Sequence, residues 1–158
     1  CKILASQDPG LSKQLGVVVF GKQAEQYASL FPFPIYPMNY VSNEKELVDI
    51  YNAVDLYVTP SLQGNLPNTI VEAMACGIPC VGFNVGGIPQ MIDHLHNGYV
   101  AEYQSAKDLA NGIRWTLTEG EYDNLSEEAC RKALSSYSES IISMRYIDIY
   151  NKITGSHA

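Results

Sequence analysis

Residues 60–87 read PSLQGNLPNTIVEAMACGIPCVGFNVGG, and this stretch decides the fold. The apolar run that precedes it, 55–59 (DLYVT), predicts a buried strand. A helix is expected after the polar loop. It should begin near Asn65, with Pro67 in its first turn, where the missing N–H of proline costs nothing. A second apolar strand is predicted over 79–83, so the stretch indicates a strand–helix–strand unit.

The predicted helix is polar along one narrow face. At about 100° per residue this face carries Asn65, Asn68, Thr69, Glu72 and Cys76. Free N–H groups and the helix dipole attract anions to the N-terminal end, which lies one turn from Glu72. This arrangement predicts a ligand with phosphate and hydroxyl groups, such as a nucleoside diphosphate. The same spacing also fits a capped helix whose polar face lies in water, and both interpretations stay open.

Strand and helix patterns alternate through the chain, and no hairpin signal separates them. The run 17–20 (VVVF) predicts a buried strand, 23–31 a helix, and 35–37 a short strand. This alternation favours an α/β fold of Rossmann-like type, with a doubly wound parallel sheet and helices on both faces. We expect the whole chain, 1–158, to form one such lobe.

Helices are also expected in the C-terminal part of the chain. Ser105 is a good N-cap for one of them, and two more are predicted over 126–136 and about 139–153. Tyr150 follows Tyr146 by four residues, which predicts one packed helix face.

Ligands of open parallel sheets bind at the carboxyl ends of the strands. Three predicted loops lie there, at 38–42, 60–65 and 84–89. Gly86 and Gly87 in the third loop suit either a close approach of backbone to a ligand or a simple turn. The residues leave this choice open.

Composition limits the class of partner. The chain has 158 residues and a net charge of −7, with no basic cluster, so a nucleic-acid partner is not expected. Its cysteines show neither CxxC nor a metal-type spacing with histidine, which predicts reduced structural thiols, a reducing compartment and no metal site. The opening CKILASQ has no Met and looks like the end of a helix, so we expect a fragment of a longer protein.

Several well-known motifs are absent from the sequence. No GxGxxG follows the first predicted strand, and there is no P-loop, no GxSxG and no zinc-binding pattern. A nicotinamide-binding Rossmann site is therefore not expected.

The stretch from about 35 to 117 resembles the C-terminal lobe of the glycosyltransferase group 1 family, the retaining nucleotide-sugar transferases of the two-lobed GT-B fold. The segments that carry the resemblance are AVDLYVTPS (53–61), NLPNTIVEAMACGIPCVGF (65–83), NVGGIPQMI (84–92) and HNGYVA (96–101). The combination of EAMACGIPCV with GGIP is highly specific.

The resemblance implies a role for the polar face of the predicted helix. Glu72 corresponds to the family's ligand of the ribose hydroxyls, and Asn68 and Thr69 would offer backbone N–H groups to the diphosphate. The loop around Tyr40 and Val41 would receive the base. No metal is implied.

The remaining expected contacts to the nucleotide sugar are Asn65, Gly86 and Gly87. The family has a second acidic residue eight positions before the ribose ligand, and here that position is Gly64. Glycine cannot hold the hydroxyls of a donor sugar, so no catalytic residue is assigned. Gln90 also stands where the family often has Glu.

By resemblance, the lobe takes a nucleotide diphosphate sugar as substrate and needs no other cofactor. Its missing partner is the N-terminal acceptor lobe, without which the fragment should be inactive. The implied setting is polysaccharide or glycolipid synthesis in the cytoplasm, with a peripheral membrane site or a lipid-linked acceptor reached through the missing lobe. Two alternatives stay open: a catalytically silent nucleotide-binding lobe, and a nucleotide-sugar epimerase of the same architecture.

Overall fold

The computed structural model describes residues 1–20, 24–38, 41 and 43–155. Helices and strands alternate along it, as the sequence predicts. In chain order they are α1 (Lys2–Gln7), α2 (Pro9–Ser12), β1 (Val17–Phe20), the 3₁₀ helix η1 (Ala24–Leu30), β2 (Ile35–Met38), α3 (Glu44–Asn52), β3 (Tyr57–Thr59), α4 (Asn68–Ala75), β4 (Cys80–Phe83), α5 (Ile88–Met91), β5 (Gly98–Ala101), α6 (Ala106–Thr118), α7 (Tyr122–Tyr137) and α8 (Glu139–Thr154).

Every strand pair among the described residues is parallel. β1 pairs with β2, and β3, β4 and β5 form a second sheet in that order. Parallel strands flanked by helices confirm the predicted α/β class. Within the described residues the two sheets are not hydrogen-bonded to each other, which the prediction of one sheet did not anticipate.

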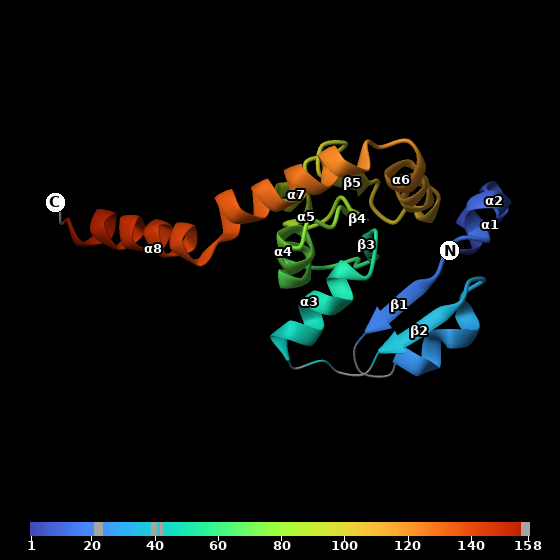
Figure 1. The fold of residues 1–158 in the computed structure, drawn as a ribbon. Coiled ribbons are helices and arrows are strands. Elements are labelled where there is room, and N and C mark those ends of the chain that lie inside the picture. The colour runs from blue at the N-terminus through green and yellow to red at the C-terminus, as the bar shows by residue number, and fades with distance from the viewer. Residues whose placement is uncertain (21–23, 39–40, 42, 156–158) are drawn as a thin grey trace.

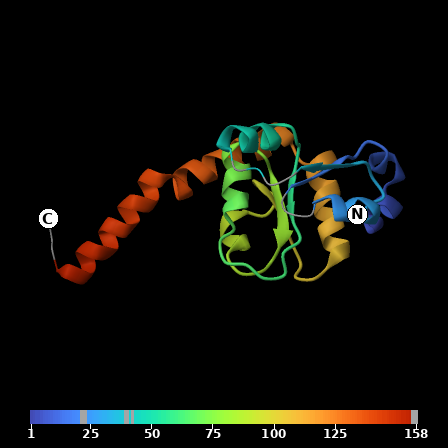
Figure 2. The same cartoon turned by 90° about the horizontal axis from the view of Figure 1, so that it is seen from below.

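β4 is the centre of the three-stranded sheet and is buried along its whole length. Helix α6 contacts β4 and β5, and α4 contacts β4 and carries α7 on its outer side. Figures 1 and 2 show α4 and α6 on opposite sides of these strands, so helices cover both faces. The main core cluster joins α4, β4, α5 and α7, and its buried members are Tyr51, Ile70, Ala73, Met74, Ile78, Cys80, Ile88, Met91, Ile92, Ala129 and Ala133.

Helix α4 begins later than the sequence pattern predicts. Its first residue is Asn68, and its N-cap, Pro67, has an extended backbone with φ −68° and ψ 121°. The prediction of a helix starting near Asn65 is therefore wrong. The carbonyl of Asn65 accepts a hydrogen bond from the Gly87 N–H at 2.8 Å, which holds Asn65 in the loop instead.

The boundaries of the other elements lie closer to those predicted from the sequence. The segment predicted as a helix over 23–31 is the 3₁₀ helix η1, and α7 begins at Tyr122, earlier than predicted. The predicted cap of α6 is confirmed, because the Ser105 hydroxyl accepts a hydrogen bond from the Asp108 N–H at 3.3 Å.

Helix α8 extends away from the rest of the molecule (Figures 1 and 2). None of its residues is buried, and Tyr146 and Tyr150 are 60% and 63% exposed. The prediction that these two tyrosines pack on one helix face is wrong, because α8 continues past the elements that would cover them. No described helix has both the length and the apolar character needed to cross a membrane.

A glycine in β4 gives a test of this packing. A Cβ at Gly82 would lie 2.9 Å from Cγ2 of Thr59 and 3.0 Å from Cγ2 of Ile88, both of them buried. Gly82→Ala should therefore lower the free energy of unfolding by about 1–3 kcal/mol, as overpacking does.

The matched control is Gly64→Ala, where a Cβ would have no atom within 4 Å. That variant should change stability by less than about 1 kcal/mol, since it only restricts the unfolded chain. Urea unfolding of both variants measures the difference, and equal midpoints would contradict the packing described here.

Candidate functional site

The loops that follow β3, β4 and β5 meet at one edge of the sheet, because the three strands are parallel. The Gly87 N–H after β4 donates to the Asn65 carbonyl after β3 at 2.8 Å. The hydroxyl of Tyr103, which follows β5, donates to the carbonyl of Leu62 at 3.3 Å. Two of the three loops predicted from the sequence, 60–65 and 84–89, are therefore in direct contact.

The glycine pair allows this contact. Gly86 has a φ of +57°, and a Cβ there would lie 1.7 Å from the Gly64 carbonyl oxygen. A Cβ at Gly87 would lie 2.5 Å from the carbonyl oxygen of Asn65. The loop after β3 therefore fills the space where a Cβ of Gly86 or Gly87 would lie. The sequence analysis considered a ligand contact and a simple turn for these glycines, and it did not consider a contact between the two loops. Contacts of Gly86 and Gly87 with a ligand stay a prediction.

The N-terminus of α4 opens beside these loops. No side chain caps it, and Asn68 is exposed while Thr69 is half-buried. The backbone N–H groups of the first turn are those that a helix leaves without partners of its own. The Ile70 N–H donates to the Pro67 carbonyl at 3.1 Å, whereas among the described residues no acceptor pairs with the N–H groups of Asn68 and Thr69, which lie where the sequence predicts an anion.

Two tyrosines hold the polar face of α4. The Tyr51 hydroxyl donates to Oε2 of Glu72 at 3.0 Å and lies 3.3 Å from the Thr69 carbonyl oxygen. The Tyr57 hydroxyl donates to Oγ1 of Thr69 at 2.8 Å. Thr69 and Glu72 are both half-buried and contact α3 and β3 through these tyrosines, whereas Asn68 is exposed.

Tyr51 keeps its proton throughout the neutral range. Burial raises the pKa of Tyr51 above its usual value, and the charge of Glu72 and the hydrogen bond to it act in the same direction. A neutral phenol is a hydrogen-bond donor, so Tyr51 fixes the position of the Glu72 carboxylate.

The remaining predicted residues are less closely connected. Tyr40 lies outside the described residues, and Val41 is half-buried between two that are not described. The structure gives Val41 no hydrogen bond to the other predicted residues in the part of the chain that it describes. Gly64 is exposed, and the space next to its Cα is open.

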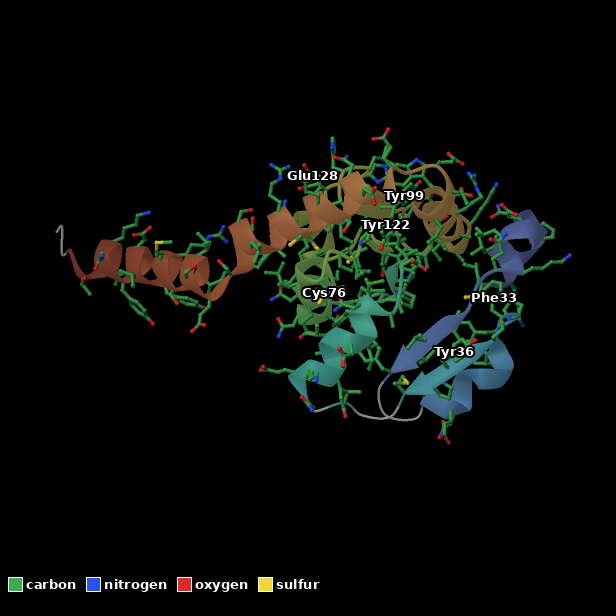
Figure 3. All side chains as sticks on the ribbon, viewed as in Figure 1. Phe33, Tyr36, Cys76, Tyr99, Tyr122 and Glu128 are labelled. Carbon is green, nitrogen blue, oxygen red and sulfur yellow. The ribbon has the colours of Figure 1, made fainter. Side chains whose placement is uncertain are left out.

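The cysteines are all free, in agreement with reduced thiols. Cys76 follows the last turn of α4 (Figure 3) and lines a surface hollow of about 620 Å³ together with Cys130 of α7. This hollow lies at the opposite end of α4 from the candidate site. Among the described residues, no group of three metal-ligating side chains is close enough to hold a metal ion.

Tyr51 and Tyr57 were not predicted as site residues. Tyr51 lies in α3 next to the apolar Ile50, and Tyr57 lies in the apolar run 55–59. The available signal was the phenol itself, because a buried tyrosine hydroxyl usually finds a hydrogen-bond partner. The sequence does not reveal which partner that is.

Comparison with known proteins shows clear similarity. The sequence pattern of the family described as glycosyl transferases group 1 matches residues 37–133. The N,N'-diacetylbacillosaminyl-diphospho-undecaprenol alpha-1,3-N-acetylgalactosaminyltransferase of Campylobacter jejuni is 30% identical over 117 residues, which cover 73% of this chain and 31% of that protein. The chain thus spans less than a third of the length of this relative.

Solved structures share the fold. HepE from Anabaena, in complex with UDP, is similar with a TM-score of 0.78 at 20% identity, over 96% of this chain and 44% of HepE. The C-terminal domain of LpcC, a glycosyl transferase group 1 family protein from Francisella tularensis, has a TM-score of 0.61 at 19% identity, over 73% of this chain and 60% of that domain. At these identities the similarity establishes the fold, that of one lobe of the GT-B architecture.

The role of Tyr51 can be tested by removing its hydroxyl. Tyr51→Phe should lower the free energy of unfolding at neutral pH by about 1–3 kcal/mol, the range for a hydrogen bond to a charged group. The control is Tyr36→Phe, since Tyr36 is exposed on β2, away from α4 (Figure 3). Removal of the Tyr36 hydroxyl should leave the free energy of unfolding nearly unchanged.

The pH dependence gives a second measurement. Because the pKa of Tyr51 is raised in the folded protein, its contribution is complete below the unfolded value of about 10 and is lost as the pH rises through the folded value. The stability difference between wild type and Tyr51→Phe should therefore shrink above about pH 10. A difference that grows with pH would show that Tyr51 is not held as a neutral donor.

Proposed function

Because the chain belongs to the glycosyl transferases group 1 family, we propose that it is the donor-binding lobe of a retaining glycosyltransferase. The complete enzyme would move a sugar from a nucleoside diphosphate to a hydroxyl group. The observation that carries the proposal is the half-buried Glu72 carboxylate, held by Tyr51 beside the uncapped start of α4. The transfer as proposed uses no cofactor apart from the nucleotide sugar itself.

Glu72 is suited to bind the ribose hydroxyls. Its Oε2 accepts the Tyr51 hydrogen bond, and within the described residues no donor contacts its other oxygen. A carboxylate with one oxygen fixed and the other unpaired is a strong acceptor for a diol. The tyrosine also spares the ligand the entropic cost of ordering this side chain.

The diphosphate is proposed to bind at the start of α4. The N–H groups of Asn68 and Thr69 and the helix dipole there favour negative charge, even though the chain carries a net charge of −7. In the transfer reaction the same donors would stabilise the leaving diphosphate as its charge develops. The base is assigned to the loop with Tyr40 and Val41.

The sugar end of the site lies towards the joined loops. Asn65, Gly86 and Gly87 lie there beside Gly64, where the family resemblance calls for an acidic residue. The acceptor is proposed to bind a second lobe outside this chain. A cytoplasmic enzyme at the inner face of the membrane fits relatives such as the Campylobacter jejuni transferase, whose name includes a diphospho-undecaprenol.

Gly64 favours one alternative, a lobe that binds the nucleotide but supports no transfer. The proposed enzyme would then need its donor sugar held by groups other than a carboxylate at this position. Transfer activity of the complete protein with its acceptor separates these two functions.

Nucleotide titration is the direct test of the site. Backbone amide shifts of the chain, followed by NMR during addition of UDP, GDP and ADP, should change at Asn68, Thr69 and Glu72 for the accepted base. The free N–H groups and the carboxylate are expected to meet the diphosphate and the ribose. If all three amides stay unmoved with every nucleotide, the assignment of the site is wrong.

Glu72→Gln sharpens this test because the amide oxygen can still accept the Tyr51 hydrogen bond. Loss of the charge should weaken binding of the accepted nucleotide by about 1–3 kcal/mol. The matched control is Glu44→Gln on the exposed first turn of α3, which should bind like the wild type. Equal affinities for the two variants would remove Glu72 from the site.

Gly64→Glu tests the sugar end. The open space at Gly64 accommodates a larger side chain, so the fold should be unaffected. The variant should bind a nucleotide sugar more tightly relative to the corresponding free nucleoside diphosphate, since only the sugar meets the new carboxylate. Isothermal titration with both ligands measures this ratio, and an unchanged ratio would show that position 64 does not contact the donor sugar.

A further inference from the structure

Two cysteines lie where the end of α4 packs against α7. Cys76 is the C-cap residue of α4, and Cys130 lies in the middle of α7. Both are half-buried, and both line the surface hollow between these helices. Cys80 differs because it is completely buried in β4, and Cys1 differs because it is exposed. Cys76 and Cys130 are therefore the two thiols that share one space open to solvent.

The two thiols are close together, although β4, α5, β5 and α6 separate them in the sequence. Sγ of Cys130 lies 3.7 Å from the carbonyl oxygen of Ala75, to which it donates a weak hydrogen bond. This carbonyl belongs to the peptide group that leads into Cys76, and the oxygen of a trans peptide lies about 2.8 Å from the next Cα. Sγ of Cys130 is therefore at most about 6.5 Å from Cα of Cys76.

This separation is near that of a bonded pair. In a disulfide, the partner sulfur lies within roughly 5 Å of the Cα, because a cysteine Sγ is about 2.8 Å from its own Cα and the S–S bond adds about 2 Å. A small adjustment of the two side chains is enough to bring the sulfur atoms of Cys76 and Cys130 into bonding distance.

The packing of α4 against α7 keeps the pair in this position. Ala129 and Ala133 of α7 are buried with Ala73 of α4 in the main core cluster. A Cβ at Gly77 would lie 2.8 Å from Oγ of Ser126, one turn before Cys130. Small residues thus let the two helices approach closely at the end of α4, and the cysteines lie along the same contact.

The surroundings of Cys76 disfavour its thiolate. Burial raises the pKa of the Cys76 thiol above its usual value, and the negative charges of Cys130 and Glu72 act in the same direction. A stabilised thiolate is what makes the disulfides of strongly oxidising proteins easy to reduce. Cys76 lacks this stabilisation, whereas an uncharged disulfide meets no repulsion from Glu72. The thiolate is also the reactive form, so Cys76 is a poor first nucleophile at neutral pH.

We propose that the hollow between α4 and α7 is an oxidation site, at which hydrogen peroxide converts Cys76 and Cys130 into an intrachain disulfide. The thiolate of Cys130 attacks the peroxide, the O–O bond breaks, and the hydroxide that leaves takes up a proton, which gives a sulfenic acid on Cys130. Cys76 then loses its proton and attacks this sulfur, and the S–O bond breaks as a second water leaves. The two thiols lose two electrons, and the peroxide is reduced to two molecules of water.

The disulfide would enclose the centre of the fold in a covalent loop. The chain from residue 76 to residue 130 contains β4, α5, β5 and α6. Closing so long a loop lowers the conformational entropy of the unfolded chain, which favours the folded one. The start of α4 is at the other end of that helix, so the disulfide stabilises the lobe without blocking the candidate site.

Peptide mapping after oxidation tests this site. The reduced, folded chain is treated with hydrogen peroxide, its remaining thiols are alkylated in denaturant, and its tryptic peptides are analysed by mass spectrometry without reduction. The peptides of Cys76 and Cys130 should be joined, with two hydrogen atoms fewer than the separate thiol peptides. Cys80 should be recovered alkylated, because it is fully buried in the folded chain. Separate peptides of Cys76 and Cys130, alkylated or oxidised to sulfinic acid, would overturn the proposal.

Two serine variants are matched to this test. Cys130→Ser should give no joined peptide, whereas Cys1→Ser, which removes the exposed thiol, should give as much of it as the wild type. If oxidation joins two chains through Cys1 while Cys76 and Cys130 stay reduced, exposure directs the reaction and the proposed pairing is wrong.

Thermal unfolding shows whether the disulfide fits the fold. The oxidised wild type, followed by the aromatic signals of its core, should unfold roughly 5–10 °C above the reduced form, because its unfolded chain has less freedom. Peroxide should not shift the midpoint of Cys130→Ser. An oxidised wild type that unfolds at or below the temperature of the reduced form would contradict the proposal, since its disulfide would then distort the packing of α4 on α7.

Discussion

The burial of β4 on both faces and both edges is the constraint on which the central part of the molecule depends. A four-residue strand enclosed in this way must satisfy its backbone through β3 and β5 and its side chains through α4, α5 and α6. Because Gly82 has no side chain, the side chains of Thr59 and Ile88 pack directly against the backbone of β4. Once these layers are fixed, the loops after β3 and β4 have to leave at the same edge, and they leave it so closely that only glycine fits at Gly86.

Tyr51 connects this core to the candidate site. Its ring packs between Phe20 of β1 and Tyr57 of β3, and its hydroxyl reaches across to the polar face of α4. The orientation of Glu72 is therefore set by the aromatic packing of the core and does not depend on a loop. A site arranged in this way is preorganised before any ligand arrives, which lowers the cost of binding.

Much of the fold could be predicted from the sequence, because buried strands and amphipathic helices have distinct periodicities. The α/β class and the loop edge follow from them. The start of α4 could not be predicted, since it depends on a hydrogen bond from Gly87, more than twenty residues away. The role of Tyr51 was hidden for a similar reason, because its partners lie on another helix. The VVVF run predicts a buried strand, but all four residues of β1 are only half-buried among the described residues. An apolar run shows which environment suits a strand, and the neighbours that would supply it are not encoded in the run itself.

Helix α8 has a consequence for how the stability of this chain is measured. It buries none of its residues, so tertiary packing contributes little to holding its sixteen residues helical. Isolated helices of this length are marginal in water. Melting of α8 is thus thermodynamically separable from the loss of the β4 core. Far-ultraviolet circular dichroism, which counts all helices, should register a broad change before aromatic signals from the core respond, so one transition temperature does not describe the whole chain.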